Sequence, residues 1–131
     1  MAITHSNAVR NAVANTVVDA VDALGVGTGT LNFRAAADAV ASIATLPFQN
    51  PAFGAAGVVT VGLATANPIT DDTTAVAGTV SHFDVKDSTA ATIFQGTVSI
   101  TTGTGDIKLS SVEIGTNDTI SVSLLTYTAP L

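Results

Sequence analysis

The chain of 131 residues contains no cysteine, no tryptophan and few charged side chains. Without cysteine there are no disulfides, thiolate metal sites or cysteine nucleophiles. Charged residues make up 11% of the chain, against about 25% in an average soluble domain. The four basic residues, Arg10, Arg34, Lys86 and Lys108, are scattered and stand against ten acidic ones. Because clustered cations bind nucleic acids and anionic membranes, we expect neither as a partner.

Long apolar runs and recognisable site motifs are missing too. No run approaches the about 20 apolar residues of a membrane span, and residues 1–6 lack the basic and apolar regions of a signal peptide, so we expect no export by that route. The glycines at 25, 27 and 29 do not have the spacing of a phosphate-binding loop. Asp71 and Asp72 lack the spacing of a calcium loop, so we expect a solvated loop there. These observations predict a protein that is not an enzyme and has no cofactor or metal.

The residues that are present indicate one domain with a helix at its start. Hydrophobic residues make up 47% of the chain, and its length fits a single domain, residues 1–131. We divide it into an N-terminal arm (1–5), a helix (6–24) capped by Ser6, and a β region (31–131). Gly25 is expected to end the helix.

Apolar residues recur along this helix at spacings of three and four, which predicts one apolar stripe. The stripe consists of Val9, Val13, Val17, Val21 and Leu24, with Asn11, Asn15, Asp19 and Asp22 on the opposite side. Valine is a mediocre helix former, so the helix needs a docking surface. We expect the stripe to cover a sheet face or an open end of the β region, or to dock on a neighbouring subunit.

Short alternating segments and turn signals fill the rest of the chain. We expect strands at 31–34, 42–48, 58–63, 76–87, 94–100, 107–114 and 119–128, and turns at 50–54 and 117–119. Residues 35–41 fit a helical turn or an irregular loop equally well. Turns every eight to twelve residues favour antiparallel sheets that close as a β-sandwich or small jelly-roll-like barrel. The predicted fold class is therefore mainly β with one N-terminal α-helix.

Two pairs of side chains are candidates for function. His82 and Asp84 lie two apart on the predicted solvent face of one strand, and we interpret them as a surface polar pair rather than a metal or proton-transfer site. Phe48 and Phe53 flank residues 49–52, where they either anchor a partner or fill the core.

Five segments together suggest a family: the Asn- and Ala-rich opening helix (7–22), the Gly29-Thr30-Leu31 strand entry, Leu46-Pro47-Phe48, the 50–54 turn and the closing 119–123 strand. Their order resembles that of small structural proteins encoded among the head genes of tailed bacteriophages. The resemblance implies a head decoration, or cement, protein made in the bacterial host cytoplasm and bound to the capsid exterior. Its implied partners are the major capsid protein and further copies of itself, with a trimer favoured over a dimer.

Residues 1–6 or the helix behind them are expected to provide one contact to the shell. The candidate partner contacts are Ile3, Val9, Val13, Val17, Phe48 and Phe53. Another virion role, as a tail-tube, head-completion or fibre-base subunit, is the nearest alternative. A carbohydrate-binding β-sandwich is a further alternative, although aromatics are only 5% of the chain. A hydrolase would have to use His5 or His82.

Overall fold

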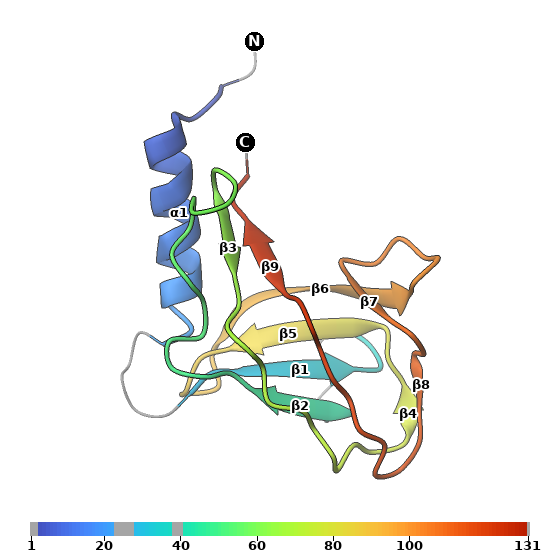
Figure 1. Ribbon diagram of the computed structural model, residues 1–131. Coiled ribbons are helices and arrows are strands. Elements are labelled where there is room, and N and C mark those ends of the chain that lie inside the picture. Colours follow the sequence, from blue (N-terminus) through green and yellow to red (C-terminus); the bar gives the residue numbers. More distant parts are fainter. Residues whose placement is uncertain (1–2, 23–27, 38–40, 131) are drawn as a thin grey trace.

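The computed structural model describes residues 3–22, 28–37 and 41–130, and in this part of the chain one helix precedes nine short strands (Figure 1). The predicted class, mainly β with one N-terminal helix, is confirmed. The elements are α1 (Asn7–Asp19), β1 (Thr30–Arg34), β2 (Ala44–Pro47), β3 (Leu63–Thr65), β4 (Gly78–Thr79), β5 (His82–Lys86), β6 (Thr92–Ile100), β7 (Ile107–Leu109), β8 (Glu113–Ile114) and β9 (Thr126–Thr128).

The main sheet has the strand order β2-β1-β5-β6-β7 and curls, while β3–β9 and β4–β8 form two small sheets. Its neighbours are antiparallel except for β6 and β7, which run parallel, so the all-antiparallel prediction is wrong at this edge. The parallel pair has only three residue pairs. The connection 101–106 therefore has to return along only a short length of strand, and no crossover helix is needed.

One face of the main sheet supplies much of the core. Leu31 and Phe33 of β1 and Phe83 and Val85 of β5 alternate along their strands, and all four are buried in a single hydrophobic cluster. Figure 1 shows β3 and β9 next to α1, while the chain that follows β3 and the chain that leads to β9 pass across the main sheet. The helix contacts β3 and β9, and its buried residues Ala14 and Val18 join the same hydrophobic cluster as the sheet residues.

The helix begins as predicted, because the Ser6 hydroxyl accepts a hydrogen bond from the Val9 amide at 3.3 Å. Its buried face is not the predicted one. Ala14 and Val18 are fully buried, whereas Val9 and Val13 are 45% and 37% exposed. The outer half of the valine stripe therefore points to solvent. The helix ends earlier than predicted, at Asp19 with Ala20 as its C-cap, and residues 20–22 form a turn. Leu24 and Gly25, where the end was expected, lie outside the described residues.

Polar side chains hold the helix against the body of the protein. The segment between β2 and β3 is irregular, so its peptide N–H groups need acceptors other than a neighbouring strand. The helix supplies them through side chains expected to face away from the core. Asn11 accepts from Gly62 N, Asn15 from Ala56 N and Asp22 from Ala52 N, each at 2.7 Å.

Several predicted strands are shorter than expected or absent. Residues 58–62 of the predicted strand 58–63 are turns and bends, because Gly57 and Gly62 have positive φ angles of 86° and 74°, and only Leu63 belongs to a strand, β3. The predicted strand 76–87 is divided into β4 and β5, and 107–114 into β7 and β8. Of 119–128 only β9 is a strand. In the uncertain stretch 35–41, residues 35–37 form a bend and turn, and 38–40 lie outside the described residues.

The loop around Asp72 closes one edge of the main sheet, which corrects the expectation of a merely solvated loop. Asp72 Oδ2 accepts a hydrogen bond from the Thr45 amide of β2 at 2.8 Å. Thr70 N donates to Pro47 O, and Val76 N donates to Ile43 O, along the same edge. The outer edge of β2 is thereby protected from pairing with another strand.

Slight burial raises the pKa of Asp72, but hydrogen bonds from Thr45 and Thr74 outweigh it and hold the pKa below the ordinary 3.8. Ionised Asp72 therefore stabilises the fold above pH 3.8, and this contribution is lost as the pH falls through the lower pKa of the folded protein. We expect Asp72→Asn to lower the free energy of unfolding at neutral pH by about 1 kcal/mol. Below pH 3.8, the difference between variant and parent in urea unfolding should shrink.

The matched control is Asp71→Asn, because Asp71 is exposed and makes no hydrogen bond to other described residues. It should leave both the neutral stability and its acid dependence unchanged. Equal behaviour of the two variants would contradict the role given to Asp72.

Candidate interaction surfaces

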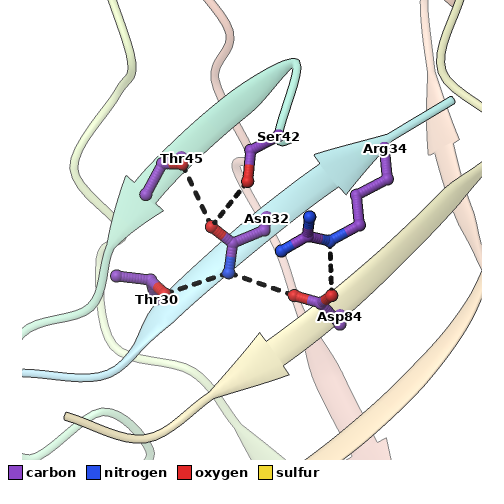
Figure 2. Close-up of polar contacts among 6 residues, drawn as sticks. All are labelled: Thr30, Asn32, Arg34, Ser42, Thr45 and Asp84. Carbon is purple, nitrogen blue, oxygen red and sulfur yellow. Dashed lines mark hydrogen bonds and ion pairs between the residues drawn. The ribbon is translucent and has the colours of Figure 1, made fainter. Parts of the chain in front are cut away.

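The outward face of β1 and β5 carries a buried polar network (Figure 2). Asn32, Arg34 and Asp84 alternate with the core residues of their strands and are all buried. Arg34 Nε lies 2.5 Å from Asp84 Oδ2, and Asn32 Nδ2 donates to Asp84 Oδ1 at 3.1 Å. Asn32 also donates to Thr30 Oγ1, and its own Oδ1 accepts from Thr45 Oγ1, both at 3.0 Å. The network therefore links β2, β1 and β5.

This arrangement corrects the interpretation of His82 and Asp84 as a solvent-exposed pair. Asp84 is buried and forms an ion pair with Arg34, while His82 Nδ1 lies 2.7 Å from the hydroxyl of Ser81. His82, Asp84 and Gln95 line a depression of about 300 Å³. Both oxygens of Asp84 already accept hydrogen bonds, so the geometry suits a structural ion pair better than a proton acceptor. Among the described residues, no three His, Asp or Glu side chains gather as metal ligands would.

Phe48 and Phe53 are core residues, which corrects the expectation that their rings contact a partner. Both are buried, and their ring centroids lie 5.7 Å apart. Phe53 also forms an isolated β-bridge with Ala66, which fixes the 50–54 turn next to the end of β3. Neither ring is available on the surface of this chain.

The other candidate contacts lie on the outside of the molecule. Ile3 is 83% exposed, Val9 and Val13 are exposed on the outward face of α1, and Val17 is half-buried. Val58 and Val59 are also exposed, in the loop that Asn11 and Asn15 hold against the helix. These five exposed residues, Ile3, Val9, Val13, Val58 and Val59, are most of the large exposed hydrophobic residues in the described part of the chain.

A second surface feature is a groove next to β7, which no motif or spacing predicted. It has a volume of about 740 Å³ and lies between the segment 106–114 and the segment 118–126. We call it the C-terminal groove. The predicted strand 119–128 would have filled this region with regular pairing, but only an isolated bridge between Asp72 and Ile120 forms before β9.

Comparisons of the chain with protein-family models, curated proteins and solved structures gave no significant match. Within the residues that the structure covers, no helix is both long and apolar enough to cross a membrane.

Proposed function

We propose that this chain is a structural protein of a tailed-bacteriophage virion, a decoration protein that binds the outside of the assembled head. The observation that carries the proposal is the outward apolar face of α1. Val9 and Val13 stand on the side of the helix that its own fold leaves open, while Asn11 and Asn15 face inward. Grouped exposed apolar residues mark protein-interaction sites. The phage assignment rests on the resemblance in the order of the chain segments.

A weak contact of this kind suits a decoration protein. Full burial of a valine contributes about 1.5–3 kcal/mol, and these valines are already partly covered, so each copy gains less. A protein that binds the assembled shell better than its free subunits stabilises the shell by linkage. Contacts repeated around a symmetry axis, or made to several capsid subunits at once, then add to a strong attachment. The proposed partners are the major capsid protein and further copies of this chain.

The variant Val9→Ser/Val13→Ser tests this face directly. We expect it to fold normally and to bind heads that lack the chain at least about tenfold more weakly than the parent. Co-sedimentation with purified heads measures the attachment. The matched control is Val76→Ser/Ile100→Ser, which changes two exposed residues of similar size away from α1. Equal binding by the test variant and the control would contradict the role of the helix face.

The position of the chain in the particle tests the decoration role itself. An electron cryo-microscopy map of the virion should show many copies on the outer surface of the head, around capsid symmetry axes. Density confined to the neck, the tail tube or a fibre base would contradict decoration and favour one of the other virion roles. Absence of the chain from purified particles would overturn the decoration role and the other virion roles alike.

A further inference from the structure

The C-terminal groove is bounded on one side by an open strand edge. The strand order ends at β7, which pairs with β6 on one side only. The opposite edge of the sheet, at β2, is closed by hydrogen bonds from Asp72 and its neighbours. Among the described residues, no segment forms such hydrogen bonds with the outer edge of β7. Open edges carry unpaired N–H and C=O groups and accept additional strands.

The other wall of the groove also has unpaired peptide groups. Residues 121–124 are not part of a strand, and their backbone groups make no hydrogen bond within the portion of the chain described here. Both neighbouring residues are tied down, since Ile120 pairs with Asp72 and Leu125 O accepts from Ala66 N at 2.8 Å. The open strand β7 and the unpaired residues 121–124 both line the same groove, which fits an inserted strand.

The side chains around the groove are apolar below and acidic at the rim. Five lining residues are 6–9% exposed, and they are Ile107, Leu109, Ile114, Ile120 and Leu125. Leu124 is 69% exposed at the rim, where burial of its side chain would remove apolar surface from water. Three carboxylates, Asp106, Glu113 and Asp118, outnumber the one cation, Lys108. An inserted segment should therefore carry an apolar side chain and no acidic one.

The N-terminal arm of the chain meets these requirements. Residues 1–6 contain no Asp or Glu and include His5 and the β-branched pair Ile3 and Thr4. Residues 3–5 are exposed and make no hydrogen bond to the rest of the described chain. Figure 1 shows the arm leading away from the body beyond the start of α1.

We infer that residues 3–5 of a second copy of this chain add as a short strand in the C-terminal groove, with Ile3 packed beside Leu124. The inserted backbone would pair with β7 and with residues 121–124. Because the arm and the groove are different surfaces, the contact is head-to-tail and can close into a ring. The inference concerns contact between copies and does not depend on the proposed attachment to a capsid.

Disulfide crosslinking tests the contact, and the cysteine-free chain makes the test specific. Ile3→Cys protein, labelled with a heavy isotope, is mixed with unlabelled Leu124→Cys protein under mild oxidation. We expect mixed dimers, identified by mass spectrometry, at a yield at least about tenfold above that of the control pair Ile3→Cys and Val76→Cys. Val76 is the matched control because it is similarly exposed but lies away from the groove. Equal yields for the two pairs would overturn the inference.

The mass of the protein in solution gives an independent measurement. Light scattering of the parent chain at increasing concentration should show association, and Ile3→Asp should raise the dissociation constant at least about tenfold. Val76→Asp should leave it unchanged. A parent chain that stays monomeric, or an Ile3→Asp variant that associates as the parent does, would refute insertion of the arm. Either result leaves the capsid-attachment test unaffected, because that test uses Val9 and Val13.

Discussion

Replacing Asp84 by asparagine should lower the free energy of unfolding by about 3–5 kcal/mol. The substitution preserves the size of the side chain but removes the negative charge that faces the buried guanidinium of Arg34. Without the charge of Asp84, the buried guanidinium loses an ion pair that offsets part of the cost of its desolvation. The asparagine can still bond to Asn32, so the expected loss comes mainly from the charge. Urea unfolding followed by circular dichroism measures it.

Two further variants separate the ion pair from a general charge effect. Asp19→Asn removes an equal charge from the exposed side of α1 and should change stability by less than about 0.5 kcal/mol. The double variant Arg34→Met/Asp84→Leu removes both charges and should be more stable than Asp84→Asn, since no buried guanidinium then lies opposite a neutral amide. An Asp84→Asn variant as stable as Asp19→Asn would show that the ion pair does not hold β1 to β5.

Local sequence signals were enough for the elements whose determinants lie within a few residues. Ser6 begins the helix, because its hydroxyl caps an amide three residues away. The alternation around Phe33 and Phe83 predicted β1 and β5, since each strand has one face in the core. The mainly β class followed from many such segments and did not require their pairing to be known.

The features that matter for function depend on contacts between distant residues. The valines had the strongest apolar period in the helix, but its orientation is fixed by Asn11 and Asn15, whose partners lie 51 and 41 residues away. Asp84 looked exposed because its partner Arg34 is 50 residues away and on another strand. The open edge at β7 had no local signal either, because a β-rich segment reads the same whether or not a neighbour pairs with it.

A methyl group at Gly29 is expected to destabilise the fold by about 3 kcal/mol, at the upper end of the usual cost of overpacking. A Cβ atom there would fall inside contact distance of Val21 Cγ1, and it would lie 2.5 Å from the carbonyl oxygen of Lys86. One obstacle is backbone of β5 and the other is a fully buried side chain, so neither can move freely. Thermal unfolding of Gly29→Ala measures the loss.

Gly54→Ala is the matched control, because its new methyl would lie 3.7 Å from Thr65 O, an ordinary contact distance, and we expect the substitution to be nearly neutral. The double variant Val21→Ala/Gly29→Ala removes the side-chain obstacle but leaves the one at Lys86 O. It should therefore be less destabilised than the sum of the single changes while remaining below the parent. Equal stability of Gly29→Ala and Gly54→Ala would contradict this close approach.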